Sequence, residues 1–256
     1  MTYSLEQIVF FLCILVRIST FIYTAPFFNQ RSVPQKVKIG ISIAFALVLY
    51  PILPYEELQY LGVIGFGLLV AKEALAGLIM GFFANVCSQI LAFAGHMIDM
   101  DIGFSMVQQF DPVSSSQVTI TANFYQYAVM LMLLVTNMHH FIVTALVDSF
   151  RVIPVGDVVL NVSIYKAFLE FVIDYFIIGF RIALPIFAAL LIVNTILAIL
   201  AKVAPQMNMF VIGMQLKVLI GLLVLLFMVT MIPSIADFIF DEMIKMLKTS
   251  IAYLKG

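Results

Sequence analysis

The stretch EALAGLIMGFFANVCSQILAFAGHMID, residues 73–99, carries the pattern that decides the fold. Its small and polar residues return at steps of four, four, three, four, four, three and four, which keeps them on one helical face. At 1.5 Å per residue that face is about 39 Å long. Small side chains let helix backbones approach closely, so the sequence predicts a helix-packing seam, against either the same chain or a neighbouring subunit. The seam comprises Glu73, Gly77, Gly81, Ala84, Ser88, Ala92, Gly95 and Asp99.

The chain around this stretch is too apolar for a water-soluble globule. Of its 256 residues, 64% are hydrophobic and 11% are charged, and its mean hydropathy is +1.14. Soluble domains usually carry about 25% charged residues. We therefore expect an all-α protein in a lipid-facing, multi-subunit membrane assembly. The two cysteines, Cys13 and Cys87, lie in apolar runs, which favours buried side chains over a disulfide or a metal site.

Apolar segments near the length of a bilayer-spanning helix, about 20 residues, partition the chain. The segment 58–98 is too long for one untilted span, so it is either a hairpin or a helix that extends beyond the bilayer. The polar link from Lys202 to Asn208 joins the last two segments and predicts a helical hairpin. A charged, aromatic stretch at 165–174 has an interfacial character. The apolar segments are 5–28, 37–53, 58–98, 118–135, 182–201 and 218–232, and a last helix is expected around 237–255.

Basic residues of short loops favour the cytoplasmic side, and they predict an orientation. Arg31, Lys36 and Lys38 place the first connection inside, whereas Glu56 and Glu57 indicate that the second lies outside. By the same rule the tip of the C-terminal hairpin faces the cytoplasm. The residues of this tip are Lys202, Pro205, Gln206 and Asn208.

Signatures of catalysis are missing from the sequence. It contains no H-E-x-x-H, no G-x-S-x-G and no glycine-rich phosphate loop. The adjacent His139 and His140 diverge by about 100° on a helix and do not converge on one metal. We therefore expect no enzyme activity and no catalytic, cofactor-binding or metal-binding residue.

Charged residues inside the apolar segments are costly unless they are paired, face water or sit at an interface. We expect structural pairing or interface anchoring, because no carboxylate pair is spaced for a proton relay. The alternative is a small-solute or ion transporter. These residues are Arg17, Lys72, Glu73, Arg181, Lys202 and Lys217.

Taken together, several stretches resemble the FliR family of flagellar export-gate proteins, whose relatives include the gate subunit of virulence injectisomes. The matches occur in the family's order, although Met138 and Gln215 stand where the family usually has glycine and proline. They are Arg17–Thr20, Ala25–Phe28, Arg31–Lys38, Glu73 with Gly77 and Gly81, Ala94–Phe104, Asp111–Pro112, Asn137–His140, Ser149–Gly156, Pro205–Gly213, Lys217 and Gly221.

The resemblance implies a function and a set of partners. It implies one copy of the chain in a closed helical hetero-oligomer with FliP and FliQ, around a pore for unfolded flagellar substrates, in the bacterial inner membrane at the flagellar basal body. FlhB and FlhA of the export apparatus are further implied partners. By this analogy residues 1–160 are FliP-like and residues 161–256 form a FliQ-like hairpin region. The equivalent injectisome subunit remains an alternative that the sequence leaves open.

The loop 103–117 is a candidate plug for such a pore. It is polar and serine-rich, yet it carries bulky apolar side chains that a solvated loop does not need. Phenylalanine and methionine fill irregular space well, so these side chains suit a narrow lumen. An ordinary surface loop with apolar anchors is the other interpretation. The plug residues are Phe104, Met106, Val107 and Phe110.

Overall fold

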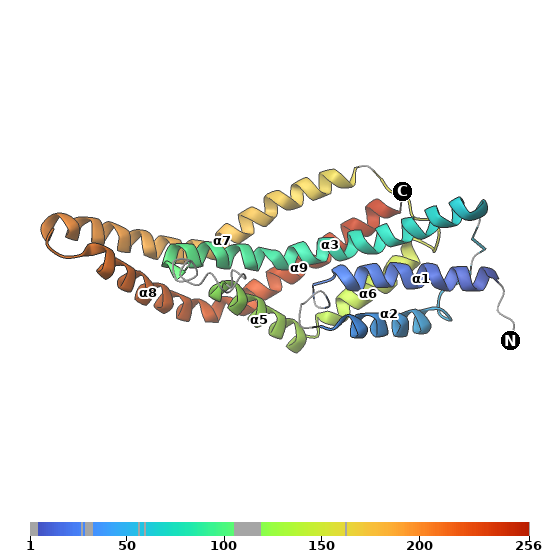
Figure 1. The fold of residues 1–256 in the computed structure, drawn as a ribbon, viewed down its shortest axis with the longest axis horizontal. Coiled ribbons are helices and arrows are strands. Elements are labelled where there is room, and N and C mark those ends of the chain that lie inside the picture. The colour runs from blue at the N-terminus through green and yellow to red at the C-terminus, as the bar shows by residue number, and fades with distance from the viewer. Residues whose placement is uncertain are drawn as a thin grey trace. The chain divides into compact units, whose positions relative to one another are not determined.

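The computed structural model describes residues 5–26, 28, 33–55, 57–58, 60–104, 119–161 and 163–255. These ranges form helices and contain no β-strand, so the predicted all-α class is confirmed. The helices in Figure 1 are α1 (Leu5–Thr24), α2 (Gln35–Leu49), α3 (Gly62–Ile102), α5 (Ile120–Val135), α6 (His139–Val152), α7 (Ile164–Val203), α8 (Met209–Met228), the short 3-10 helix η1 (Val229–Met231) and α9 (Ile232–Leu254).

Proline and asparagine explain several helix boundaries. Pro34 stands at the N-cap of α2 with an extended backbone, at φ −60° and ψ 144°. Proline has no N–H to donate, which costs nothing at a helix start because the first N–H groups lack intrahelical partners. Asn208 caps α8, since its side chain accepts a hydrogen bond from the backbone N–H of Val211 at 3.4 Å. Pro185 lies inside α7 and removes one hydrogen bond from it.

Two of the predicted segments differ from the observed helices. The long apolar stretch is one helix of 41 residues, α3, so the hairpin alternative is wrong. The stretch 165–174 and the segment 182–201 belong to one helix of 40 residues, α7. The single long helix α3 is the other alternative that the sequence left open. The start of α7 was missed because a 20-residue window finds a span's worth of apolar sequence but does not detect where a helix continues.

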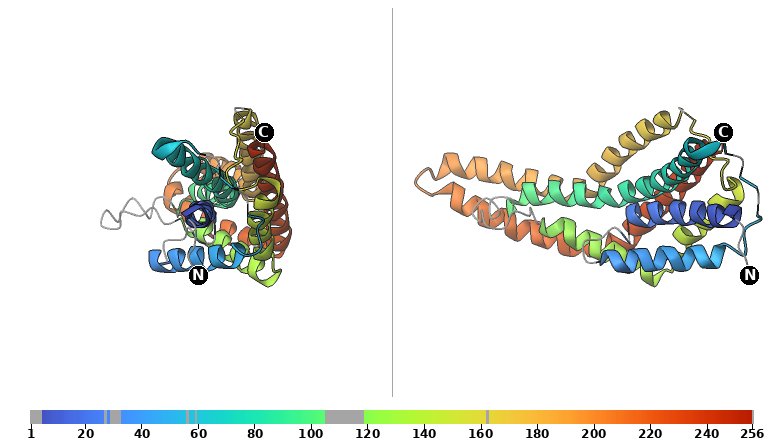
Figure 2. Two further views of the ribbon diagram at one scale, coloured as in Figure 1. Left: turned by 90° about the vertical axis from the view of Figure 1, so that its right-hand side faces the viewer. Right: turned by 45° about the vertical axis from the view of Figure 1, so that its right-hand side comes forward.

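The chain divides into two compact units, and α3, α7 and α9 each contribute to both. Unit 1 comprises residues 1–87, 137–171 and 240–256, and unit 2 comprises residues 88–136 and 172–239. In unit 1, α1 runs beside α2 and the first part of α3 (Figures 1 and 2). Its core includes Phe10, Ile14, Ile18, Phe21, Met80, Cys87, Leu146, Phe150 and Phe171.

Unit 2 is built from the second part of α3, α5, most of α7, α8 and the start of α9. The chain turns back between α7 and α8, and the two helices form a hairpin (Figure 1). Gly221 of α8 allows a close approach, because an added Cβ there would meet the Ile102 side chain at 2.7 Å. The core of this unit includes Ile90, Ala94, Ile98, Ile102, Tyr125, Val129, Ile186, Leu190 and Met228.

In the described part of the chain, four helical segments are long and apolar enough to cross a membrane, or five if α5 and α6 together count as one broken span. They are Leu5–Thr24, Gly62–Ile102, Ile164–Val203 and Met209–Leu254. Many large apolar side chains of α7 and α8 are exposed in the isolated chain, among them Phe180, Leu184, Leu226 and Phe227. Exposed apolar area on this scale marks a surface made for lipid or protein. The chain is an all-α membrane protein.

Candidate functional site

The first part of the predicted seam faces α1 within unit 1. Gly77 lies against Arg17 and Thr20, where an added Cβ would overlap the Arg17 carbonyl oxygen and the Thr20 hydroxyl. One turn further on, an added Cβ at Gly81 would overlap the Thr24 hydroxyl and lie 2.9 Å from the Phe21 carbonyl oxygen. Glycine is therefore required at both positions for α1 and α3 to pack at this separation. Ala84 continues the same face and is fully buried.

The second part of the seam faces α5 within unit 2. An added Cβ at Gly95 would lie 2.7 Å from the Ala122 Cβ. Asp99 is buried, and both oxygens of its carboxylate accept a hydrogen bond from the backbone N–H of Thr121, at 3.2 Å each. The Thr121 hydroxyl also donates to this carboxylate. Asp99 thus caps the N-terminus of α5, whose own N-cap residue, Thr119, makes no side-chain cap. Ser88 and Ala92, between these positions, are half-buried.

These contacts are all made inside the chain. The seam against a neighbouring subunit stays a prediction.

Arg17 and Glu73 form a buried ion pair across α1 and α3, with both side chains 0% exposed. The Arg17 guanidinium donates two hydrogen bonds to the Glu73 carboxylate, from Nε to Oε2 at 2.5 Å and from Nη2 to Oε1 at 3.0 Å. A two-point contact of this kind fixes the orientation of both side chains. The predicted structural pairing of the charges within apolar segments is confirmed for these two residues.

The same pair also holds the end of α6, and we call the whole group the Arg17 cluster: Arg17, Glu73, Ser149, Phe150, Ile153, Pro154 and Gly156. Arg17 Nη1 donates to the carbonyl oxygens of Ile153 at 3.0 Å and Ser149 at 3.5 Å, and Nη2 donates to that of Pro154 at 3.4 Å. Glu73 Oε1 accepts a hydrogen bond from Gly156 N–H at 2.8 Å.

Two features complete the geometry of the Arg17 cluster. Gly156 adopts φ +99°, a conformation that favours glycine, and this lets its N–H turn toward Glu73. The guanidinium carbon lies 4.4 Å from the centre of the Phe150 ring, which adds a cation–π contact. One ion pair therefore satisfies the free carbonyls at the C-terminal end of α6 and fixes its exit turn.

The tip of the C-terminal hairpin is exposed. α7 ends at Val203 and α8 begins at Met209, and the side chains of Lys202, Pro205, Gln206 and Asn208 all lie on the surface. The other charges within apolar segments differ in exposure. Lys72 and Arg181 are exposed, and Lys217 is half-buried.

Only the start of the candidate plug loop is described. Gly103 adopts φ +96° at the end of α3, and Phe104 is half-buried. Met106, Val107 and Phe110 lie outside the described residues.

Groups that would carry metal or thiol chemistry are sparse in the described part of the chain. It contains no cluster of three or more His, Cys, Asp or Glu side chains able to hold a metal ion. The rings of His139 and His140 lie beside one another, 4.2 Å apart between centres. Cys13 and Cys87 are free and buried, so their predicted packing role is confirmed.

Two sets of contacts in this site could not be predicted from the sequence pattern. The pairing of Asp99 with Thr121 crosses a loop, and the carbonyl groups held by Arg17 lie more than 130 residues further along the chain. The sequence does carry a signal for the contacts at the end of α6, the turn Pro154-Val155-Gly156. A proline and a glycine so close together indicate a turn in the backbone.

Comparison with known proteins places the chain in a family. The model of the family "Bacterial export proteins, family 1" matches residues 8–243. The flagellar biosynthetic protein FliR of Pectobacterium carotovorum is 31% identical over 94% of this chain and 92% of its own length. FliR of Bacillus subtilis is 31% identical over 94% of both chains, and FliR of Escherichia coli is 29% identical over 94% of this chain and 92% of its own. The protein therefore belongs to family 1 of the bacterial export proteins.

Proposed function

We propose that the protein is a core subunit of the flagellar protein export gate in the bacterial inner membrane. The observation that carries the proposal is the family match over residues 8–243, together with flagellar relatives that align over nearly their whole length. The exposed apolar faces of α7 and α8 fit a subunit that is buried among lipid and other subunits. FliP and FliQ are its direct partners in this proposal, and FlhA and FlhB are its neighbours in the export apparatus.

The proposed role is that of a passive conduit for unfolded flagellar substrates, and the protein is not an enzyme. The buried charges Arg17, Glu73 and Asp99 are all engaged in hydrogen bonds that join helices to one another. Arg17 and Glu73 join helices within unit 1, and Asp99 joins helices within unit 2, so each of these charges has a structural role in its own unit. The energy for export would come from other components of the apparatus.

Residues 1–160 serve as the FliP-like part and residues 161–256 as the FliQ-like part in this proposal, so that one copy closes the ring. The α7–α8 hairpin, with its exposed tip, supports a FliQ-like role for the second part. The loop 103–117 acts as the plug of the closed pore, and its residues Phe104, Met106, Val107 and Phe110 support that role by their bulk.

The experiment starts with a chromosomally tagged chain purified from membranes in mild detergent. FliP and FliQ should elute with it in one complex. The second step deletes residues 106–114 from the tagged chain and measures the conductance of the membrane to small ions. The deletion complex should assemble and should leak, because the side chains that fill the lumen are gone.

Two outcomes count against the proposal. A parent chain that co-purifies with neither FliP nor FliQ would contradict its place in the gate. An assembled deletion complex as tight as the parent would remove the plug assignment alone. The parent complex at the same expression level sets the baseline.

A further inference from the structure

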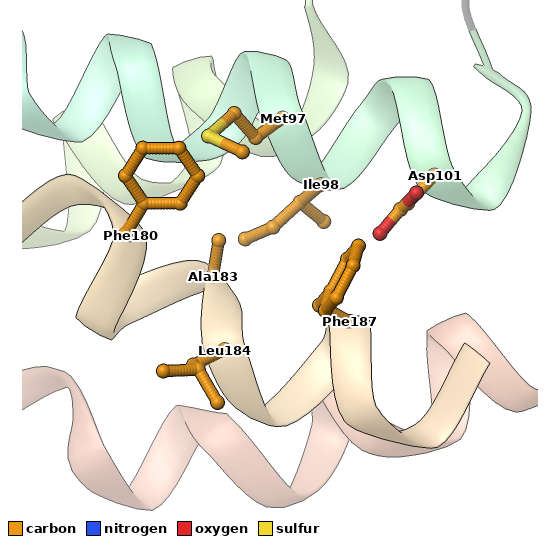
Figure 3. A pocket seen from close by; sticks show the side chains of 7 residues that line it. All are labelled: Met97, Ile98, Asp101, Phe180, Ala183, Leu184 and Phe187. Carbon is orange, nitrogen blue, oxygen red and sulfur yellow. The ribbon is translucent and has the colours of Figure 1, made fainter. Parts of the chain in front are cut away.

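A cavity of about 70 Å³ opens between α3 and α7 in unit 2 (Figure 3). Its volume is several times the roughly 10–15 Å³ that one water molecule needs. Met97 and Phe180 lie at one end, and Asp101 and Phe187 lie at the other. Six of the seven described lining residues are apolar and Asp101 is acidic. The lining consists of Met97, Ile98, Asp101, Phe180, Ala183, Leu184 and Phe187.

The inner wall of this cavity is fixed by the packing of α3 on α7. Ile98 and Ala183 line the cavity and are buried. The Phe93 ring meets the Phe180 ring edge-on, with 5.8 Å between centres. Gly179 makes room for this contact, because an added Cβ there would overlap the Phe93 ring. The cavity is therefore formed in the isolated chain and does not need an occupant to open it.

The outer wall is exposed. Phe180, Leu184 and Phe187 each leave about half of their surface open, at 51%, 57% and 45%. A group from outside the chain can therefore enter from the α7 side.

Among the described residues, the Asp101 carboxylate in the cavity has no partner within salt-bridge distance. Asp101 is half-buried among apolar side chains, and none of the described residues forms a salt bridge with it. Lys217 of α8 attracts the Asp101 carboxylate from a greater distance. A carboxylate that is partly removed from water is costly unless a cation or a hydrogen-bond donor compensates it.

We propose that this cavity receives a lysine or arginine side chain from a neighbouring protein subunit. This proposal rests on the proposed function. The aliphatic stem of such a side chain covers apolar walls while its charged end reaches a carboxylate. The rings of Phe180 and Phe187 add favourable contacts with the cation. One side chain thus matches both the apolar lining and the single acidic group.

Lipid is a poorer match to the same cavity. An acyl chain would fill the apolar part of the cavity, but it would remove water from the Asp101 carboxylate without pairing with it. An amine headgroup would bring a phosphate with it, and none of the described lining residues is basic and able to receive that phosphate. The charge and the lining together therefore favour a protein occupant.

Photo-crosslinking in the assembled complex tests the proposal. A benzoylphenylalanine residue at position 184, in the exposed wall, should crosslink to a protein subunit, at a peptide that contains the basic residue. Asp101→Lys should lower the yield of assembled complex about tenfold or more, because like charges would then meet in a desolvated pocket. Asp241→Lys, on an exposed part of α9, makes the same charge change and should leave the yield unchanged. Replacing the mapped basic residue by Asp should restore assembly of the Asp101→Lys chain.

Crosslinks to lipid alone, or no crosslink at all, would overturn the proposal. So would an Asp101→Lys complex recovered at the parent's yield. Failure of the proposed function has a different signature, since FliP and FliQ would then be absent from the parent complex whatever position 184 contacts.

Discussion

Arg17 shows how a charge can be kept inside an apolar helix. The guanidinium makes five contacts within hydrogen-bond distance, two to Glu73 and three to backbone carbonyls at the end of α6. Burying two charges costs several kcal/mol per ion, and such a pair is tolerated only when good geometry and further hydrogen bonds offset that cost. The Arg17 cluster meets both conditions.

Replacing Arg17 by methionine should therefore be strongly destabilising. Glu73 would remain buried without its partner, and the carbonyls of Ile153 and Pro154 would lose their donor. We expect a loss of about 3–5 kcal/mol in the free energy of unfolding. The measurement is denaturant unfolding of the purified chain in detergent.

Two further variants make that test specific. Arg151→Met removes an exposed arginine paired with Asp148, where the side chains are 71% and 45% exposed, and should cost less than about 1 kcal/mol. The double variant Arg17→Met with Glu73→Met removes both charges and should recover part of the loss. An Arg17→Met chain as stable as the parent would show that the pair contributes nothing to the fold.

At the scale of the element, one face of α3 packs against two different helices. The steps of four and three keep the small residues in line, and they meet α1 near Gly77 and Gly81 and α5 near Gly95 and Asp99. The end of the face is polar because Asp99 has to satisfy free N–H groups at the start of α5. The pattern is thus a packing surface whose last position also serves as a helix cap.

Gly81→Leu tests the closeness of the α1–α3 contact. The new side chain would run into the Thr24 hydroxyl and the Phe21 carbonyl, and overpacking of this kind costs about 1–3 kcal/mol. Gly67→Leu is the matched control on the same helix, because nothing lies within 4 Å of a Cβ built at Gly67. The thermal midpoint of unfolding should fall for Gly81→Leu and stay near the parent value for Gly67→Leu. Equal midpoints for the two variants would mean that the seam is not tight at Gly81.

At the scale of the whole molecule, the orientation in the membrane is a prediction from charge alone. The basic residues of the first connection and Lys202 predict that the hairpin tip lies on the cytoplasmic side, and Glu57 predicts that the second connection lies on the other side. Both Glu57 and Asn208 are exposed, so a probe can reach either position.

A cysteine at position 208 should react with a thiol reagent from the cytoplasmic side only. The background lacks Cys13 and Cys87, which are buried, so labelling reports position 208 alone. A cysteine at position 57 is the paired control and should react with an impermeant reagent from the outer side. Outer-side labelling at position 208 would reverse the predicted orientation.

The sequence by itself determined the helical class, the membrane character and the family of this protein. Composition decides the membrane character, because a chain with 11% charged residues cannot cover a water-exposed surface of this size. The helical class follows from the apolar segments of about 20 residues or more, which is the length of a bilayer-spanning helix. Helical periodicity also shows which α3 residues share a face, since the 3.6-residue repeat is a local property of the backbone. The motifs that support the family lie in order along most of the chain, and the family match covers residues 8–243.

Only the tertiary structure decided what those faces meet. Periodicity places Glu73 and Asp99 on one face, but it is silent about Arg17 and Thr121, their partners on other helices. The Arg17 cluster joins groups 56 to 137 residues apart in the chain, and no local pattern encodes such a contact. The cavity at Asp101 likewise depends on α7 packing beside α3. Contacts of this kind arise because apolar faces and buried charges select their partners by shape and hydrogen-bond geometry once the chain has folded.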